Sequence, residues 1–363
     1  MFNLNNNKSK KSMTEELVAL ASNIERKIVF SDGNDIRLIK ALDYFKDHNK
    51  SSFILIGNES QIIEKLNEAG LKDKARFSIF DPSNFNRNTE YSDIVKSAFE
   101  KRGKKITGQQ IAELLLNSSY IAAIKLKNSE ADCAVGGSIS TTVDLMRAVI
   151  HVLGLAKGKK FLSSSGYVEV PDCEYGIEGK FFISDPGIIP KPTEEQLLDI
   201  TLSTYDTAKA FFGNKTVVAL LSYSTKGSAK SEDIDMIRKV AETAKQMKPE
   251  MIIDGEMQFD AAIVPDVCAS KAPESPVKGK ANVLIFPDLN AANIALKIIQ
   301  RLAKASVCAS ILQGAAKPFN DLSRGCTVEG IIALTAMTLI QRKNMEDDNL
   351  LYENQSLSLI GPG

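Results

Sequence analysis

Short apolar runs alternate with amphipathic segments along most of this chain, and this alternation is the strongest constraint on its fold. The runs have the length of strands, and the segments between them carry apolar residues at helical spacing. Such a pattern predicts an α/β protein in which helices cover a parallel sheet. The predicted strands are 27–30, 53–56, 77–80, 132–135, 160–164, 180–184, 216–222, 251–253, 283–286 and 307–314.

The starts of the helices and one domain boundary also leave signals. Three Ser/Thr residues stand three positions before Glu or Gln, the spacing of a capping box that opens a helix. The pairs are Ser12 with Glu15, Thr107 with Gln110, and Thr193 with Gln196. A Gly/Pro/Ser-rich stretch between the predicted strands 160–164 and 180–184 indicates the passage into a second domain.

The segment 317–329, KPFNDLSRGCTVE, is the first candidate for a functional site. It follows the predicted strand 307–314 and leads into an apolar helix at 328–339. Backbone N–H groups and the macrodipole attract anions to a helix N-terminus, and Arg324 and Ser323 add a guanidinium and a hydroxyl. Together they describe a pocket for a phosphate or carboxylate. The alternative is a polar connection in which Asp321 and Thr327 only cap the helix.

Composition narrows the class of protein. Its 363 residues are enough for two or three domains, and 45 basic residues balance 45 acidic ones, so we expect neither a nucleic-acid nor a membrane partner. The sequence has no apolar run of the ~18 residues that a transmembrane helix requires. Its N-terminus lacks the apolar core of a secretory signal peptide. We expect a cytosolic protein. Its five cysteines are scattered, which suggests neither a disulfide framework nor a zinc site.

Several common chemistries lack their motifs. The chain contains no G-x-x-x-x-G-K-[ST] loop and no G-x-G-x-x-G after a strand. Its two histidines are His48, at a polar helix end, and His151, in an apolar helix where a structural role is the simpler interpretation. A Ser-His-Asp triad and a multi-histidine metal site are therefore improbable. The groups that remain for catalysis are hydroxyls, guanidinium groups, carboxylates and backbone donors. They suit transfer of an acyl or phosphoryl group better than metal-assisted hydrolysis.

Five long blocks of the chain form a distinctive series. They are ADCAVGGSISTTVDLMRA (131–148), ALLSYSTKGSA (219–229), IDGEMQFDAA (253–262), KAPESPVKGKANVLIFPDLNAANIALK (271–297) and ILQGAAKPFNDLSRGC (311–326). These blocks resemble the phosphate acetyltransferase family. The C-terminal blocks are the more specific, and the likeness extends from about Val29 to Gln341.

This resemblance implies reversible transfer of an acetyl group between acetyl phosphate and coenzyme A (CoA). CoA is then a substrate, and neither a cofactor nor a metal takes part in the transfer. Family members are cytoplasmic and usually dimeric. The implied fold has two three-layer α/β/α domains with largely parallel sheets facing across a cleft. We place the first domain at 1–153, joined by the returning segment 316–363, and the second, dimer-forming domain at 154–315.

The resemblance also implies roles for residues. In the family the thiol of CoA attacks the acetyl carbonyl directly in a ternary complex, and the serine and arginine of the N-D-L-S-R-G motif correspond to Ser323 and Arg324. Arg102 and Arg147 match arginines that bind anionic substrate groups, including the phosphates of CoA. Without the resemblance, an ordinary position on the solvated surface would explain each arginine. Three further residues of these blocks complete the candidate substrate-binding set: Ser138, Thr141 and Asn320.

One position departs from the family's pattern. The aspartate that serves as base lies seven residues beyond the serine, and here that position is Gly330. Its neighbour Glu329 is the first candidate for a replacement and Asp321 the second. A thiol of pKa ~8.5 is already partly ionised near neutrality. If no base replaces the aspartate, the enzyme is slower and its rate rises steeply with pH between about 7 and 9.

Two other functions remain open from the sequence. One is transfer of a butyryl or propionyl group in place of an acetyl group. One methylene changes the discrimination between two such substrates by only ~1–3 kcal/mol, so small differences in the acyl pocket decide between them. The other is an impaired homologue that binds CoA and has a regulatory role. The loop 224–228, STKGS, and the acidic residues Asp254, Glu256 and Asp260 also suggest phosphate or metal binding, but helix capping and dipole effects explain them as well.

Overall fold

The strands of this chain form two separate sheets. The computed structural model describes residues 11–71, 75–84 and 89–358. The first sheet has five strands in the order β11-β4-β1-β2-β3, and all its neighbouring strands are parallel. These are β1 (Lys27–Phe30), β2 (Ser52–Ile56), β3 (Phe77–Phe80), β4 (Cys133–Gly136) and β11 (Phe319–Asp321).

The second sheet has six strands in the order β10-β5-β6-β9-β7-β8. Strand β5 is antiparallel to both of its neighbours, and the remaining pairs are parallel. The mixed α/β class with largely parallel sheets is therefore confirmed. The strands are β5 (Ser163–Glu169), β6 (Lys180–Ser184), β7 (Val217–Leu221), β8 (Ile252–Met257), β9 (Val283–Ile285) and β10 (Ser306–Gln313).

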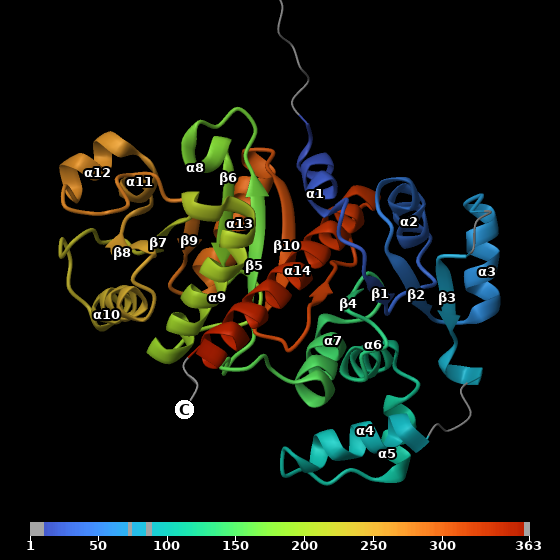
Figure 1. Cartoon of the computed structure of the whole chain (residues 1–363). Helices are drawn as coiled ribbons and strands as arrows, with labels where there is room; N and C mark the ends of the chain where they lie inside the picture. The colour runs from blue at the N-terminus through green and yellow to red at the C-terminus, as the bar shows by residue number, and fades with distance from the viewer. Residues whose placement is uncertain (1–10, 72–74, 85–88, 359–363) are drawn as a thin grey trace, which may run out of the picture.

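Helices cover both faces of each sheet (Figure 1). The three capping boxes predicted from the sequence are present and open α1, α5 and α9. The helices are α1 (Met13–Ala21), α2 (Ile36–His48), α3 (Glu59–Glu68), α4 (Thr89–Glu100), α5 (Gly108–Leu114), α6 (Ser118–Lys127), α7 (Thr142–Ala148), α8 (Tyr175–Glu178), α9 (Glu194–Phe212), α10 (Glu232–Met247), α11 (Phe259–Ile263), α12 (Pro265–Lys271), α13 (Leu289–Leu302) and α14 (Val328–Ser358). A π-helical segment, η2 (Val149–Leu153), extends α7, and the short 3₁₀ segments are η1 (Pro82–Asn84) and η3 (Gly213–Lys215).

One hydrophobic core runs continuously across the same face of both sheets. Its buried side chains come from α1, α2 and α14 over the first sheet and from α9 and α10 over the second. The opposite face of each sheet has a core of its own, built with α6 and α7 in one case and α11 to α13 in the other. The shared core therefore fixes the two sheets relative to each other.

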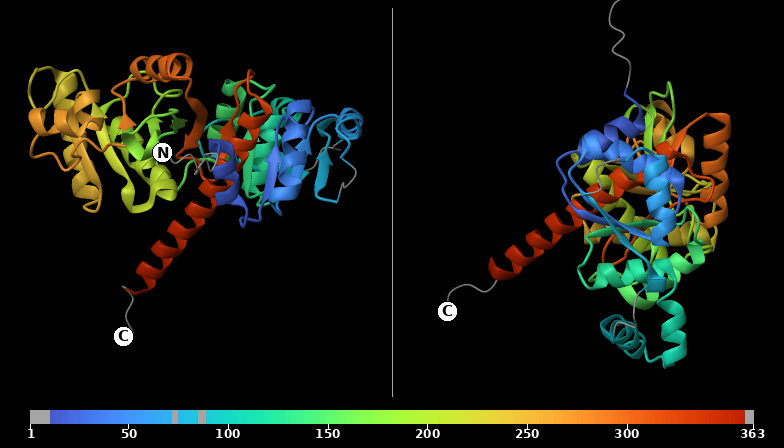
Figure 2. Two further views of the ribbon diagram at one scale, coloured as in Figure 1. Left: turned by 90° about the horizontal axis from the view of Figure 1, so that it is seen from above. Right: turned by 90° about the vertical axis from the view of Figure 1, so that its right-hand side faces the viewer.

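The C-terminal segment differs from the sequence prediction in two ways. The strand that leads into the 322–327 loop is β11 of the first sheet, whereas β10 is an edge strand of the second sheet. Because β11 has only three residues, Phe-Asn-Asp, it offers no apolar run to detect. The helix predicted at 328–339 is longer than its apolar pattern indicated, because α14 continues to Ser358 and extends away from the body of the molecule (Figure 2).

The chain passes from the first sheet to the second and back again. Strands β1 to β4 and β11 lie in the segments 1–153 and 316–363, and β5 to β10 lie in 154–315. The boundaries themselves stay a prediction. In the part of the chain that the structure describes, none of the helices combines the length and hydrophobicity that a membrane span needs.

Asn320 holds the junction between the sheets. Its fully buried side chain accepts a hydrogen bond from the backbone N–H of Leu312 on β10 (2.8 Å). Its amide group donates to Thr338 Oγ1 (2.9 Å) and Gln341 Oε1 (3.0 Å) on α14. One side chain on β11 thus links an edge strand of the second sheet to the helix that packs on both.

We predict that Asn320→Ala destabilises the fold by about 1–3 kcal/mol, because it leaves the buried Leu312 N–H without its acceptor. Urea unfolding measures the change. Asn214→Ala, at an exposed position, is the control and should stay within about 0.5 kcal/mol of the wild type. An Asn320→Ala protein as stable as this control would contradict a structural role for the amide.

Candidate active site

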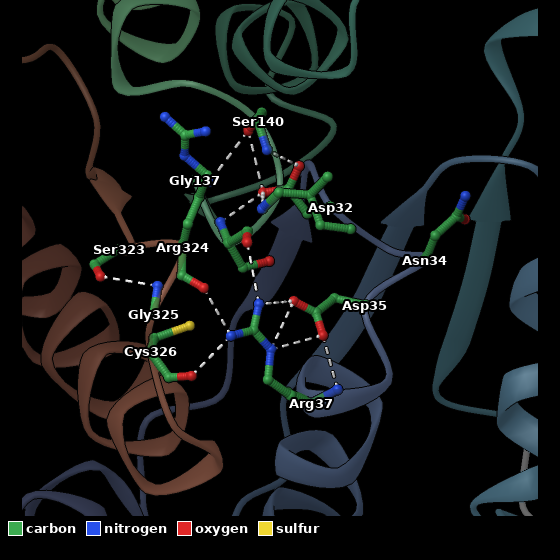
Figure 3. A network of polar contacts seen from close by, with 12 residues as sticks. Asp32, Asn34, Asp35, Arg37, Gly137, Ser140, Ser323, Arg324, Gly325 and Cys326 are labelled. Carbon is green, nitrogen blue, oxygen red and sulfur yellow. Dashed lines mark hydrogen bonds and ion pairs between the residues drawn. The ribbon is translucent and has the colours of Figure 1, made fainter.

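Three loops meet at one edge of the first sheet. They follow β1, β4 and β11, which are neighbours in the parallel sheet, so their carboxyl ends lie side by side. The loops are residues 31–35, 137–141 and 322–327, and each leads into a helix: α2, α7 and α14. Figure 3 shows their side chains converging. Clefts at such edges are where open α/β sheets place their sites.

Asp32, in the loop after β1, organises the loop after β4. Its buried carboxylate accepts hydrogen bonds from the backbone N–H groups of Ser138 (2.9 Å), Ile139 (3.3 Å) and Ser140 (3.2 Å). The Ser140 hydroxyl donates to the same carboxylate (3.1 Å). Since successive N–H groups point at one anion, the loop wraps around Asp32 and is held in a single conformation.

Arg37, in the first turn of α2, holds the loop after β11. Its Nη1 donates to the carbonyl oxygens of Arg324 (2.9 Å) and Cys326 (2.9 Å), and its Nη2 donates to the carbonyl oxygen of Ser138 (3.1 Å). Asp35 binds the same guanidinium from the other side at 2.7 Å. One planar fork therefore ties all three loops together, and its geometry determines their spacing.

The Asp35 carboxyl is adapted to this role. Burial raises its pKa, but hydrogen bonds from Arg37 outweigh burial and leave the pKa below its usual value. The carboxylate also accepts a hydrogen bond from the backbone N–H of Arg37 (2.8 Å), so it caps α2. Asp35 therefore stays ionised over the neutral range and keeps the guanidinium oriented.

Gly137 lets the loops after β4 and β11 approach closely. Its φ of +87° lies in the left-handed region that glycine adopts readily. A Cβ at this position would lie 2.0 Å from Asp321 Oδ1 and 2.6 Å from the carbonyl oxygen of Leu322. Any side chain would push the loop after β11 outwards.

The arrangement presents Ser323 and Arg324 to solvent side by side. Both are exposed, although Leu322 just before them is buried. Ser323 Oγ accepts a hydrogen bond from the backbone N–H of Gly325 (3.1 Å), which leaves its own proton available to another acceptor. The guanidinium of Arg324 extends away from Arg37 towards the side of Ser140 (Figure 3). Among the described residues it forms no hydrogen bond or ion pair, so it is available to an anion.

The other residues predicted for this region have different surroundings. Glu329 is exposed in the first turn of α14. Thr141 caps α7 by accepting a hydrogen bond from the Asp144 N–H (3.1 Å), and Ser138 is buried among the contacts of Asp32 and Arg37. Asn320 is enclosed at the sheet junction and is not placed to contact a substrate.

The capping alternative for this segment is half right. Thr327 does cap α14, because its Oγ1 accepts a hydrogen bond from the Gly330 N–H (3.1 Å). Asp321 instead accepts a hydrogen bond from Thr142 Oγ1 (2.6 Å) on α7. Packing does not require glycine at 330, since a Cβ there would lie 3.6 Å from Thr327 Oγ1, an ordinary contact.

Arg102 and Arg147 come together at a second location, around His151 on η2. Burial lowers the pKa of His151, and the positive charges of Arg102, Lys104 and Arg147 lower it further. The guanidinium of Arg102 also donates to the carbonyl oxygen of Ile150 (2.6 Å). A cavity of about 840 Å³ lies between α4 and η2, with Arg102, Lys127 and His151 in its lining. The lining carries both signs of charge: Lys101, Arg102 and Lys127 are basic, and Glu90 and Asp93 are acidic.

The loop 224–228 of the second sheet is occupied by the protein's own carboxylate. Glu256 is fully buried and accepts hydrogen bonds from the Gly227 N–H (2.7 Å) and Ser224 Oγ (3.0 Å), and it pairs with Arg238 (3.2 Å). The donors that the sequence offered to a phosphate are therefore used internally. Within the described ranges, no group of three or more His, Cys, Asp or Glu side chains is arranged to hold a metal ion.

Sequence reasoning missed the three residues that build the site: Asp32, Asp35 and Arg37. The strand 27–30 was predicted, but nothing in the sequence shows which residues contact the acidic side chains that follow it. The available signal was topological: loops that follow parallel strands meet at one edge, so polar residues after β1 belong with those after β4 and β11.

Comparisons with known proteins show which family the chain belongs to. Residues 12–339 match the family model for phosphate acetyl/butaryl transferase. A phosphate acetyltransferase of Thermoanaerobacterium thermosaccharolyticum is 38% identical over 331 residues, covering 91% of this chain and 99% of that protein.

Two solved structures share the fold, each with 32% identity and 92% of this chain covered. They are a phosphotransacetylase from Streptococcus pyogenes (TM-score 0.83, 99% of that chain) and the EutD phosphotransacetylase from Staphylococcus aureus (TM-score 0.80, 100% of that chain). The chain therefore belongs to the phosphate acetyl/butaryl transferase family.

Proposed function

We propose that this protein transfers an acetyl group between acetyl phosphate and CoA, giving acetyl-CoA and phosphate. The observation that carries the proposal is the pair Ser323 and Arg324, exposed together on a loop that Arg37 and Gly137 hold in place. The loop offers a hydroxyl and an uncompensated guanidinium at adjacent positions. Acyl phosphates need both: a donor at the carbonyl oxygen and a cation at the phosphate.

Ser323 stabilises the charge that develops on the carbonyl oxygen. When the CoA sulfur forms its bond to the acetyl carbon, negative charge moves to that oxygen. A hydroxyl that already accepts the Gly325 N–H has its proton directed elsewhere and can donate it to the oxyanion. A positioned donor of this kind typically lowers the barrier by ~3–4 kcal/mol.

Arg324 binds the phosphate. A guanidinium matches the geometry of a phosphate with two parallel N–H donors, which fixes the orientation of the leaving group and compensates its charge. In the free protein this guanidinium has no protein anion among the described residues to displace. The substrate therefore meets a cation that is ready to bind.

Arg102 and Arg147 bind the phosphates of CoA in this proposal. Their charges act on the same histidine, and Arg102 lines the cavity between α4 and η2. Arg147 lies on α7 and His151 on its continuation η2, and the N-terminus of α7 borders the Ser323 loop. CoA is long enough to place its nucleotide end and its thiol at separate locations, so the two groups of residues serve one substrate.

We further propose that the protein is cytoplasmic and forms a homodimer through α13. Ile294, Ile298 and Leu302 follow one another at one-turn spacing on this helix and are 57%, 51% and 80% exposed. Such a stripe on a single helix is self-complementary across a two-fold axis. A second copy of the chain is therefore the occupant that we assign to it.

We predict that Ser323→Ala lowers kcat about 10²–10³-fold, because it removes the oxyanion donor. Arg324→Lys should lower kcat/KM about 10- to 100-fold, since a charge-assisted hydrogen bond contributes about 1.5–3 kcal/mol. The measurement is acetyl-CoA formation from CoA and acetyl, propionyl or butyryl phosphate. Lys215→Arg, at an exposed position on η3, is the control.

The three acyl phosphates separate the possible functions. Fastest turnover of acetyl phosphate supports the proposal, and fastest turnover of butyryl or propionyl phosphate identifies a different acyl specificity. CoA binding without turnover of any of them identifies an impaired, regulatory homologue. Full activity in both the Ser323 and Arg324 variants would remove the site assignment.

We predict that Arg37→Lys lowers kcat about 10- to 100-fold while the protein stays folded. An ammonium cannot reach three carbonyl oxygens in one plane, so the Ser323 loop shifts, and a misplacement of ~1 Å costs up to about 10²-fold. Arg26→Lys is the matched control, because Arg26 pairs with Glu346 away from the three loops. A wild-type rate in Arg37→Lys would show that the loop does not need this guanidinium.

For the dimer, light scattering after size exclusion gives the mass in solution. Ile298→Asp should convert a dimer into a monomer, because it places a charge in the apolar stripe. Leu20→Asp, at another apolar position that is 59% exposed, should leave the dimer intact. A wild-type monomer, or a dimer that survives Ile298→Asp, contradicts this interface.

A further inference from the structure

A buried carboxylate lies directly behind the Ser323 loop. Asp321 is the last residue of β11, two positions before Ser323, and its side chain is only 8% exposed. Its Oδ2 accepts the hydrogen bond from Thr142 Oγ1, whereas its Oδ1 has no hydrogen-bond partner among the described residues. Buried polar oxygens almost always have partners, so an orphaned one beside a candidate active site requires an explanation.

The surroundings of Asp321 favour proton exchange near neutral pH. Burial raises the pKa of Asp321 to about 6, the hydrogen bond from Thr142 opposes this rise, and the negative charge of Asp32 adds to it. Asp32 faces it from the loop after β1 and Thr142 from α7, and Gly137 packs against its Oδ1. At pH 7 the group is mostly ionised, and it is a stronger base than an exposed aspartate. A base whose pKa lies near the working pH is the most effective one.

Thr142 connects this buried group to the surface. It is the first residue of α7 and is itself exposed. Its hydroxyl proton is directed at Asp321, which leaves the oxygen's lone pairs free to accept a hydrogen bond from a group outside. A proton that arrives at Thr142 Oγ1 therefore has a direct path to the carboxylate.

We propose that Asp321 receives the proton of the CoA thiol and that the hydroxyl of Thr142 relays it. The inference rests on the proposed function, and it supplies the base that is missing at Gly330. Asp321 is preferred to Glu329 because Asp321 is buried directly behind the Ser323 loop, whereas Glu329 is exposed in the first turn of α14.

The proton and the electron pairs balance in this step. The thiol proton passes to Thr142 Oγ1 as the hydroxyl's own proton passes to Asp321 Oδ2. The sulfur electron pair forms the bond to the acetyl carbon, and the bond between that carbon and the phosphate oxygen breaks, with phosphate leaving as the anion. Asp321 then loses its proton to solvent, and the reverse reaction uses the same groups in the opposite order.

The pH profile of acetyl-CoA formation tests the proposal. With Asp321 as acceptor, kcat/KM for CoA rises with pH through about 6 and is flat from about 7 to the thiol pKa of about 8.5, because the ionised carboxylate is the active form. Without any base, the rate instead rises about tenfold per pH unit up to the thiol pKa of about 8.5. The two profiles do not resemble each other, so the wild type alone separates them.

Three variants assign the profile to these residues. Asp321→Asn should lower kcat about 10²–10⁴-fold and shift the remaining activity to the steep profile between pH 7 and 9. Thr142→Val removes the relay and should behave in the same way, whereas Thr142→Ser keeps the hydroxyl and should retain most activity. Because Thr142 lies at a helix end, its variants remain informative if Asp321→Asn does not fold.

If the rise in rate through about pH 6 persists in both Asp321→Asn and Thr142→Val, the proposal is overturned. If this rise in rate instead disappears in Glu329→Gln, the proposal is also overturned and Glu329 is the base. Absence of acetyl transfer in the wild type is a different result, because it refutes the proposed function itself.

Discussion

The guanidinium of Arg37 is the contact on which the site depends. It binds three carbonyl oxygens from two different loops, and Asp35 orients it from the far side. Loops that follow different strands have no covalent reason to keep a fixed spacing. Hydrogen bonds from one rigid, planar group supply that spacing, and Asp32 does the same for the loop after β4. Ser323 and Arg324 contact substrate in our proposal only because other side chains hold their backbone.

The division into two sheets also helps to position the Ser323 loop. Residues 154–315 form the whole second sheet before the chain returns as β11, so the segment that carries Ser323 enters the first sheet beside β4. Asn320 fixes that return by bonding to β10 and α14 at once. The motif therefore combines two kinds of residue: Asn320 and Leu322 face inwards and hold the segment, whereas Ser323 and Arg324 face outwards.

Much of this architecture was accessible from the sequence, and the omissions have physical causes. Buried parallel strands such as β7 and β9 are apolar throughout, and capping boxes such as that of Thr193 are local, so both leave signals in consecutive residues. β11 is too short to leave one. The contacts of Asp32 and Arg37 join positions more than 100 residues apart, and Asn320 was predicted to bind substrate because a motif does not show which of its side chains point inwards. Gly330 was visible in the sequence, and Asp321 was the second candidate to replace the missing aspartate after Glu329. Only the structure shows that Asp321 is buried behind the Ser323 loop.

The central claim is that the loops after β1, β4 and β11 form one site for an acyl phosphate and a thiol. A crystal structure of the protein with CoA and phosphate tests it most directly. The account predicts a phosphate held by the guanidinium of Arg324 and a CoA sulfur within hydrogen-bonding reach of Thr142 Oγ1, with the nucleotide end near Arg102 and Arg147. A phosphate bound elsewhere with Arg324 still free, or a sulfur far from the Ser323 loop, would contradict it.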